Sequence, residues 1–422
     1  MAASYRFATD DDVDAMAEVH TRSWQAAYTG LLDQAALDAL DPADRAAMLR
    51  PMVEPAFQQE RGVTMIVAEV DGALAGHVVV QVHEEHCIML MLYLDPPHWG
   101  TGIGTALHDM AVRVMHRAGR TTGTLRVLEG NDRAIAFYER HGWTMTGQRF
   151  DDEIFGIALV DLEMSRELSV DLLAANRDYW DTKAPAYADV TTWSPEISWG
   201  IFGVPDNSLR NGEGIFPDVA GLDVVELGCG TAYVSNWAQL RGARTATGID
   251  NSPEQLATAA RFVEERESPL TLVRGDAHHL PYADESFDVA INEYGAAIWC
   301  DPHTWIPEAA RVLRPGGLLW FLGNSVIAML CVREFEDEAA TPEMLRPQRG
   351  MRRFDWIDTP NVEFHVSHGE TIQILNEAGF EIQALHELYA PQGADTRYGF
   401  VDSEWASQWP HEEVWVARKR AL

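Results

Sequence analysis

The sequence predicts an α/β protein of two domains, the second of which is built on a doubly wound parallel sheet. With 422 residues, the chain is long enough for two or three separate cores. Twice, at residues 87–117 and 224–240, an apolar run leads into a glycine-rich turn and then a helical pattern. After the second turn, strands and helices alternate to the C-terminus, which is typical of a sheet with helices on both faces. We place the domain boundary between residues 166 and 167.

The composition favours a globular protein that acts on small molecules. Apolar residues make up 46% of the chain, an ordinary share. The formal net charge of -33 repels phosphate backbones and anionic lipids, so we expect no nucleic acid or membrane partner. The acidic residues 1–14 predict no signal peptide, and the four scattered cysteines indicate reduced thiols in the cytoplasm.

In the first domain, most elements are predicted from local patterns. Thr9 and the three aspartates after it predict a helix start, because a capping hydroxyl and acids stabilise the first turn. The apolar run at residues 87–94 predicts a strand that is buried on both faces. The other expected elements are strands at residues 4–8, 65–70, 74–82 and 124–129, and helices that end at residue 24 or span residues 31–49 and 105–117.

The strand at residues 87–94 leads into the run DPPHWGTGIG at residues 95–104. Its prolines stop the strand, and its alternate glycines expose backbone N–H groups at a helix start, which makes a phosphate cradle. The run NDRAIAFY follows at residues 131–138. Together, the two segments resemble the Gcn5-related N-acetyltransferase (GNAT) superfamily, over about residues 4–166. The resemblance implies a mixed α+β sheet and acetyl-CoA as the cofactor.

The GNAT resemblance also assigns roles to residues. Backbone groups of Leu92, Tyr93 and Leu94 would hold the acetyl and pantetheine parts of acetyl-CoA. Asn131 would bond the pantetheine arm. Tyr138 would be the general acid that reprotonates the departing thiolate, and the alternative is a core tyrosine. The phosphate loop would comprise Trp99, Gly100, Gly102, Ile103 and Gly104.

The chain departs from the GNAT pattern at two places. Trp99 stands where the family usually has arginine or glutamine, so one donor to phosphate is lost while the backbone cradle is kept. The strand before the loop has no glutamate, although relatives often carry a general base there. A base would come from the stretch His83, Glu84, Glu85 and His86, or would act through water.

The second domain begins after a charged segment, residues 164–177, that we expect to be a helical or semi-ordered connector. Residues 191–217 are irregular but rich in large apolar side chains, as in a lid or substrate wall. The strands of the sheet are expected at residues 222–227, 245–249, 270–274, 287–292, 318–323, 381–389 and 412–418, the last antiparallel. Helices are expected at residues 302–313 and 370–378, and an insertion with a helical part at residues 324–360.

The second glycine turn is VVELGCGT at residues 224–231, and the next strand ends in Asp250. The glycines let a ligand approach the backbone, and a carboxylate at this spacing accepts hydrogen bonds from two ribose hydroxyls. Tyr233 stands where a dinucleotide site needs a third glycine, and Glu226 suits a ligand with an amino group. With the runs GDA at 275–277, SFDV at 286–289 and RVLRPGG at 311–317, residues 178–422 resemble the class I S-adenosylmethionine (SAM) methyltransferases. The resemblance implies a Rossmann-like sheet of seven strands.

By this resemblance, Glu226 would bind the methionine amine of SAM, Asp250 the ribose and Asp276 the adenine side. The structural alternatives are that Glu226 only braces the turn and that Asp250 only caps a helix. The remaining cofactor residues would be Gly228, Cys229, Gly230, Asn251, Ala277 and Asn292. Contact with the methyl acceptor is expected of Glu293, Tyr294 or His303, which follow the fourth strand.

Histidine pairs at residues 278–279 and 365/368 lack carboxylate or cysteine partners at ligand spacing, so we expect no metal. The leading hypothesis is a bifunctional enzyme that methylates and N-acetylates small molecules with SAM and acetyl-CoA. In a second reading, the GNAT-like half is only a binding or regulatory module of a methyltransferase. In a third, both halves sense their cofactors without turnover.

Overall fold

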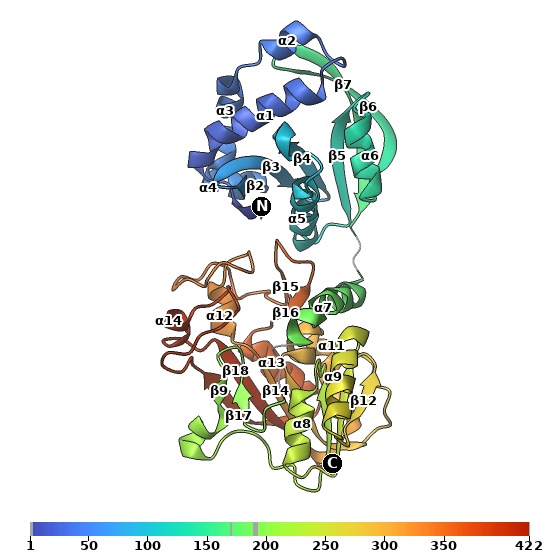
Figure 1. Ribbon diagram of the computed structural model, residues 1–422, viewed down its shortest axis with the longest axis vertical. Coiled ribbons are helices and arrows are strands. Elements are labelled where there is room, and N and C mark those ends of the chain that lie inside the picture. The colour runs from blue at the N-terminus through green and yellow to red at the C-terminus, as the bar shows by residue number, and fades with distance from the viewer. Residues whose placement is uncertain (1–2, 169–170, 189–192, 422) are drawn as a thin grey trace. The chain divides into compact units, whose positions relative to one another are not determined.

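A computed structural model describes residues 3–168, 171–188 and 193–421 (Figure 1). The chain divides into two compact units, Met1–Val170 and Asp171–Leu422. The boundary expected between residues 166 and 167 falls inside the last strand of the first unit, which ends at Glu167. The segment expected to be a connector is therefore divided. Met164 lies fully buried in that strand, and helix α7 of the second unit begins at Leu172.

The first unit is a seven-stranded sheet in the order β1-β2-β3-β4-β5-β7-β6. All neighbours are antiparallel except β4 and β5, which are parallel. Strands β6 and β7 were not predicted, because the mostly polar and exposed β6 shows no apolar alternation. The strands are β1 (Ser4–Phe7), β2 (Val63–Val70), β3 (Ala73–Val82), β4 (Cys87–Leu94), β5 (Thr122–Leu128), β6 (Thr144–Ile154) and β7 (Ile157–Glu167).

Helices cover both faces of this sheet. On one face, His20 of α1 stacks on Tyr93 of β4; on the other, Leu107 of α5 lies against Gly76 of β3. The single helix expected at residues 31–49 is two helices, because Pro42 starts a new one with Asp41 as its cap. The helices are α1 (Val13–Ala27), α2 (Gln34–Asp38), α3 (Pro42–Leu49), α4 (Pro55–Arg61), α5 (Ile103–Arg117) and α6 (Asp132–Arg140).

Strands β4 and β5 pair over only three residues each. Cys87–Met89 lie opposite Gly123–Leu125, and a bulge at Leu90 shifts the pairing of β4 with β3. Beyond the bulge, residues 91–94 of β4 pair with β3 on one edge, and no strand of the described residues pairs with them on the other. The expectation that this strand is buried on both faces is therefore wrong for its second half, where Leu90 is 39% exposed. The separation leaves an open backbone edge beside the glycine loop.

The second unit is a seven-stranded sheet in the order β12-β11-β10-β13-β14-β18-β17. The five strands from β12 to β14 are parallel, and β18 is antiparallel to both of its neighbours, as predicted. The strands are β10 (Asp223–Leu227), β11 (Thr245–Asp250), β12 (Thr271–Arg274), β13 (Phe287–Glu293), β14 (Leu313–Asn324), β17 (Phe380–Leu388) and β18 (Glu412–Lys419).

Alternate residues of the central strands feed two cores, one on each face of this sheet. Val224 and Ile291 pack in the core that contains residues of α8 (Tyr233–Leu240) and α9 (Pro253–Glu265). Val225 and Ala290 pack in the core that contains residues of α11 (Pro302–Val312) and α13 (His368–Glu377). This period of two is what a doubly wound sheet requires.

Further elements surround the carboxyl edge of this sheet. They are α7 (Leu172–Ala188), β8 (Ser198–Trp199), β9 (Val204–Pro205), α10 (Gly295–Trp299), α12 (Val326–Cys331), β15 (Arg353–Asp355), β16 (Val362–Phe364) and α14 (Ser403–Ala406). Residues of the insertion form a third core with Phe202, Phe400 and Trp405. Among the described residues, no helix is long and apolar enough to cross a membrane.

Candidate active sites

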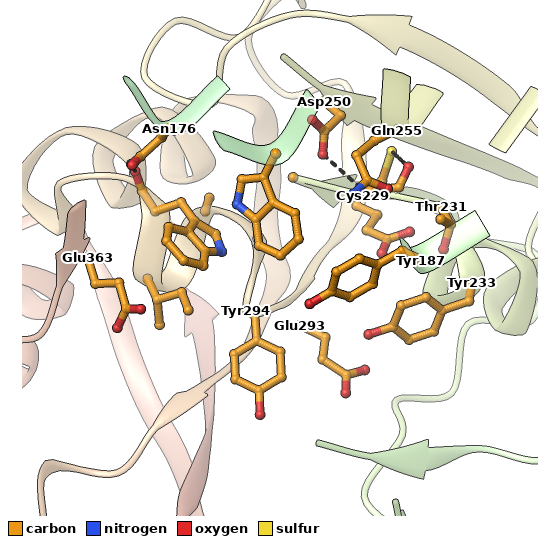
Figure 2. A pocket seen from close by; sticks show the side chains of 18 of the residues that line it. Asn176, Tyr187, Cys229, Thr231, Tyr233, Asp250, Gln255, Glu293, Tyr294 and Glu363 are labelled. Carbon is orange, nitrogen blue, oxygen red and sulfur yellow. Dashed lines mark hydrogen bonds between the residues drawn. The ribbon is translucent and has the colours of Figure 1, made fainter. Parts of the chain in front are cut away.

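The second unit holds a cavity of about 650 Å³ at the carboxyl edge of its sheet (Figure 2). The ends of β10, β11 and β13 contribute Gly228, Asp250 and Glu293 to its wall. Helix α7 and residues 194–201 line it as well, so part of the irregular segment forms a wall as predicted; residues 191–192 of that segment lie outside the described residues. A parallel sheet of this kind binds its ligands at this edge.

The glycine turn after β10 is shaped by close packing. Gly228 has a φ of 74°, and a Cβ atom there would lie 2.7 Å from the Cα atom of Gly295, which starts α10. The two glycines therefore let the loops after β10 and β13 touch. Gly228, Cys229 and Gly230 all line the cavity, so the turn exposes its backbone to a ligand.

Asp250 is held in place by two backbone donors. Its Oδ2 accepts a hydrogen bond from the N–H of Gly230 at 2.7 Å, and its Oδ1 accepts one from Ser252 at 2.8 Å. Burial raises its pKa, although the backbone hydrogen bonds oppose the shift. Each carboxylate oxygen keeps acceptor capacity for a further donor. The carboxylate is thus oriented to receive two ligand hydroxyls.

Glu226 accepts hydrogen bonds from within the protein and also lines the cavity. Its Oε2 accepts hydrogen bonds from the backbone N–H and the hydroxyl of Ser235, at 2.7 Å and 2.6 Å. Its Oε1 has no hydrogen-bond partner among the described residues. Burial raises the pKa of Glu226 to about 8. A cationic ligand group at Oε1 would favour the ionised carboxylate.

Three further predicted cofactor residues, Asn251, Asp276 and Ala277, line the cavity. Asp276 also accepts two hydrogen bonds from His278 at Oδ1, one from its backbone N–H and one shared with Nδ1, both 2.9 Å. Asn292 does not line the cavity. Its side chain is fully buried, and its Oδ1 accepts a hydrogen bond from Ala297 at 3.3 Å, because alternation along β13 turns it away from Glu293.

Glu293 and Tyr233 lie together on the cavity wall (Figure 2). The N–H of Gly200 donates to Oε1 of Glu293 at 2.8 Å. Burial raises the pKa of this carboxyl to about 7, although the N–H of Gly200 and the nearby Tyr233 oppose the shift. Its Oε2 is buried and has no hydrogen-bond partner among the described residues. A carboxyl group that titrates near neutral pH in a cavity is suited to take up a proton from a bound molecule.

Of the other two predicted acceptor residues, one lies in the cavity. Tyr294 lines it with a φ of 60°, an unfavourable conformation for a large side chain, and its buried hydroxyl has no partner among the described residues. His303 does not line it. It lies on α11 and contacts Glu370 at 3.0 Å, because α11 packs against α13 rather than facing the cavity.

Much of the opposite wall was not predicted as a site. The hydroxyl of Tyr179 donates to Glu336 at 3.1 Å, and the hydroxyls of Tyr187 and Tyr398 lie 2.9 Å apart. These contacts join α7 to the insertion and to the segment after β17 across more than a hundred residues of sequence. The resemblance of residues 178–422 to the class I methyltransferases, which begins within α7, was the one signal that pointed to this wall.

In the first unit, the glycine loop lies beside the open edge of β4. Gly100 and Gly102 have φ values of 78° and 94°, and a Cβ atom at either would meet nothing within 4 Å. The loop leads directly into α5, which begins at Ile103. Trp99 donates from Nε1 to the carbonyl of Leu94 at 3.1 Å, and the guanidinium of Arg133 stacks on its ring at 3.3 Å. The loop thus offers free space and a nearby cation to a phosphate group.

Tyr138 lies on α6, and Asn131 immediately precedes this helix. The Oδ1 of Asn131 accepts a hydrogen bond from Ala134 at 3.2 Å and caps the helix, which leaves its amide N–H groups available. Burial raises the pKa of Tyr138, and the nearby Tyr93 adds to the shift. Tyr138 is therefore protonated near neutral pH and lies close to the open edge of β4.

Comparison with known families finds a match in each unit. Residues 22–143 match the Acetyltransferase (GNAT) family, and residues 225–321 match the Methyltransferase domain family. The chain joins an N-terminal GNAT domain to a C-terminal methyltransferase domain. Both are transferase domains, so the prediction of an enzyme with this domain order is confirmed. The predicted fold class, a mixed sheet followed by a doubly wound seven-stranded sheet, is confirmed as well.

The curated relatives match the methyltransferase domain. A malonyl-[acyl-carrier protein] O-methyltransferase of Dechloromonas aromatica is 33% identical over 34% of this chain and 48% of its own length. Methyltransferase GfsG of Streptomyces halstedii is 36% identical over 29% of this chain and 42% of its own length. The chain thus spans less than half the length of each of these relatives.

Solved structures resemble each domain separately. An S-adenosylmethionine-dependent methyltransferase from Mesorhizobium loti is 26% identical, with a TM-score of 0.41, and covers 48% of this chain and 94% of its own. A PaiA N-acetyltransferase from Thermoplasma acidophilum, in complex with coenzyme A, is 20% identical, with a TM-score of 0.34, and covers 40% of this chain and 99% of its own.

Two side-chain groups have the composition of a metal site, one in each domain. In the GNAT domain, His108, Asp109 and His141 lie together, but His108 already contacts Asp109 at Nδ1 and accepts from Trp143 at Nε2, both at 2.9 Å. In the methyltransferase domain, the group is Asp276, His278 and Cys300. There, His278 contacts Asp276 and accepts from the N–H of Asp301 at 3.2 Å. Internal hydrogen bonds thus account for both histidines.

Proposed function

We propose that this protein is a bifunctional enzyme that methylates and N-acetylates small molecules. The observation that carries the methyl half is the pair of oriented carboxylates, Glu226 and Asp250, around one glycine turn on a cavity of about 650 Å³. The matched methyltransferase domain supports SAM as the cofactor, and the matched GNAT domain supports acetyl-CoA. A cytoplasmic location and the absence of nucleic acid and membrane partners remain part of this proposal, on the strength of the charge of -33.

The residues of the methyltransferase cavity suit SAM. Glu226 would bind the amino group through its Oε1, and Asp250 would accept from both ribose hydroxyls. Asp276 would lie on the adenine side. SAM, when bound, supplies a methyl group that a nucleophile can take in one in-line step, so positioning provides most of the catalysis.

On the acceptor side, Glu293 is the candidate base, because its Oε2 has no hydrogen-bond partner among the described residues and its carboxyl lies beside Tyr233 on the cavity wall. With a pKa of about 7, Glu293 can accept a proton from a hydroxyl or ammonium group as the acceptor becomes a nucleophile. Tyr294 offers an unpartnered buried hydroxyl to the same molecule. Curated relatives named as methyltransferases of malonyl-[acyl-carrier protein], a fatty acid and a hydroquinone support a small organic group as the methylated part of the acceptor.

In the GNAT domain, the unpaired edge of β4 would bind the pantetheine arm and polarise the thioester carbonyl through backbone N–H groups. The loop from Trp99 to Gly104 would hold the pyrophosphate. Tyr138 would donate a proton to the sulfur that leaves. Acetyl-CoA, when bound, supplies a thioester that an amine can attack directly.

Binding and turnover of the full chain test this proposal. We expect calorimetry to show one site for SAM and one for acetyl-CoA, and an extract of small molecules to take up labelled methyl groups. Absence of SAM binding would contradict the methyl half.

The second candidate is a methyltransferase whose GNAT domain only binds a ligand. Trp99 in place of a basic residue and the lack of an acid on β4 favour it. Release of CoA thiol from acetyl-CoA by the full chain, slowed in Tyr138→Phe while acetyl-CoA binding is kept, would decide for acetyl transfer. No amine-dependent thiol release at all would decide for the binding module.

A further inference from the structure

Arg45 of the GNAT domain is a buried cation that forms no ion pair within the described part of the chain. The side chain comes from α3 and is 1% exposed, and none of its three guanidinium nitrogens has a hydrogen-bond partner among the described residues. Its planar group lies between two aromatic rings, at 4.1 Å from Trp24 and 3.7 Å from Phe155. Stacking satisfies the faces of a guanidinium but not the N–H groups around its edge.

This arrangement is unfavourable unless something completes it. Burial lowers the pKa of Arg45 to about 10, and the nearby groups that oppose the shift are Tyr93, Tyr28 and Asp44. Asp44 is exposed and forms no ion pair with Arg45. In a chain with 65 acidic residues, a carboxylate partner would have been easy to supply. A buried guanidinium left with free donors is therefore best explained by an anion that it binds.

The surroundings of Arg45 connect it to the proposed thioester site. Tyr93 lies on the open half of β4, where His20 stacks on its ring at 4.0 Å. Burial raises the pKa of Tyr28, and the nearby Tyr93 and Tyr138, the candidate general acid, add to the shift. A single cluster thus extends from Arg45 along the inner face of α1 to the end of β4.

Two neutral histidines complete the cluster. His20 and His77 are buried, and neither ring has a hydrogen-bond partner in the described part of the chain. Burial lowers the pKa of both, that of His77 to about 4, so neither is charged near neutral pH. They do not neutralise Arg45, and they leave its positive charge available to an incoming anion.

We propose that Arg45 binds an anionic group, of carboxylate or phosphate type, on the amine that the GNAT domain acetylates. The guanidinium edge matches such a group with two parallel hydrogen bonds. This inference rests on the proposed acetyl transfer. In that reaction the amine nitrogen bonds to the acetyl carbon, the carbon–sulfur bond breaks, and the amine gives up a proton while the CoA sulfur gains one.

Phe155 covers the guanidinium from the outside. It lies in the turn between β6 and β7 with a φ of 53°, and it is 37% exposed although its ring stacks on a buried group. A φ in this range is uncommon for a bulky side chain. Phe155 thus marks the side of the guanidinium that lies nearest to solvent, which is where we expect the anion to enter.

The first experiment needs neither acetyl-CoA nor turnover. Melting of the full chain is followed by calorimetry in sodium acetate or inorganic phosphate, against sodium chloride of equal ionic strength. We expect both probe anions to raise one transition of the wild type, and Arg45→Met to abolish the rise. The control is Arg50→Met, which removes an exposed arginine paired with Asp10 and Asp14. An equal rise in Arg45→Met, or no rise in the wild type, would overturn the assignment.

The second experiment identifies the source of the anion. Thiol release from acetyl-CoA is measured with the common L-amino acids, their C-terminal carboxamides, and O-phosphoethanolamine beside ethanolamine. We expect at least a tenfold higher kcat/KM for the anionic member of the preferred pair, and loss of that preference in Arg45→Met, with partial recovery in Arg45→Lys. Equal use of both members by the wild type would overturn the proposal. If no amine releases thiol, acetyl transfer itself has failed, and the anion titration alone decides whether Arg45 is an anion site.

Discussion

At the scale of single residues, we expect the carboxylate of Asp250 to be a main determinant of SAM binding in the methyltransferase cavity. Two backbone N–H groups fix its orientation, so the unoccupied lone pairs point in set directions. Loss of a charged acceptor of two hydrogen bonds weakens binding by about 2–3 kcal/mol. We therefore expect Asp250→Ala to raise the Kd for SAM by about 30- to 150-fold in calorimetry. Asp218→Ala, at an exposed residue away from the cavity, serves as the control, and equal affinity in both variants would contradict this role.

The buried acids Glu226 and Glu293 make the stability of the second unit depend on pH. Their pKa values, about 8 and about 7, lie above the ordinary 4.5, so the folded state binds more protons than the unfolded state between pH 4.5 and 8. The free energy of unfolding of the second unit therefore falls as the pH rises from about 4.5 to 8. Over the whole window, the loss is at most about 5 kcal/mol for Glu226 and about 3 kcal/mol for Glu293.

Glu293→Gln keeps an acceptor for the N–H of Gly200 but removes the carboxyl group that titrates. In denaturant unfolding of the SAM-free protein, we expect a smaller loss of stability between pH 5 and 8 than in the wild type. Equal pH dependence in the two proteins would mean that Glu293 does not titrate in this range.

At the scale of elements, the two glycine turns were predictable because their signals are local. Glycines at alternate positions after an apolar run predict a backbone that a ligand can approach, whatever the rest of the chain does. The same holds for Asp250, which lies at a fixed distance from its turn. Asn292 and His303 show where local reasoning ends. One is turned inward by strand alternation and the other is held by Glu370, which is distant in the sequence.

Two features could not be predicted from local patterns. One is the separation of β4 from β5, and the other is the cavity wall to which α7 contributes Tyr179 and Tyr187. The first depends on a bulge at Leu90 and on how β5 pairs with β7. The second depends on contacts such as that of Tyr187 with Tyr398. Arg45 was not predicted either, because it reads as an ordinary arginine of an alanine-rich helix until its burial is known.

The glycine loop of the GNAT domain provides its own matched control. Gly102 and Gly119 stand at opposite ends of α5, both with positive φ and with no atom within 4 Å of an added Cβ. A glutamate at either costs similar backbone strain, but only Gly102→Glu places a negative charge beside the proposed pyrophosphate. We expect Gly102→Glu to abolish acetyl-CoA binding and Gly119→Glu to keep it, as measured by calorimetry. If both variants bind alike, the loop is not the phosphate site.

At the scale of the whole molecule, the two units have separate sheets and separate cores. Each is therefore expected to fold alone. The place of division matters, because Glu167 still pairs with Thr122 and Leu168 is buried against the first sheet. We expect residues 1–170 and 171–422 to be folded and to bind acetyl-CoA and SAM respectively. A fragment that ends at residue 166 should melt at a lower temperature than one that ends at residue 170.

The short distance in sequence between the two units suggests why they are joined in a single polypeptide. Strand β7 ends at Glu167 and helix α7 begins at Leu172, so a few residues tether two active sites at an effective concentration in the millimolar range. Such a tether helps only if the product of one site is bound by the other. We therefore propose that the acetyl and methyl acceptors share one scaffold.

Once an acceptor of either unit is found, its product is offered to the separate fragment of the other unit and, in parallel, to the full chain. Conversion by both, with a faster second step in the full chain, is the expected result. If the product is neither bound nor converted, the shared scaffold is wrong, and the GNAT domain is better explained as a regulator of the methyltransferase domain.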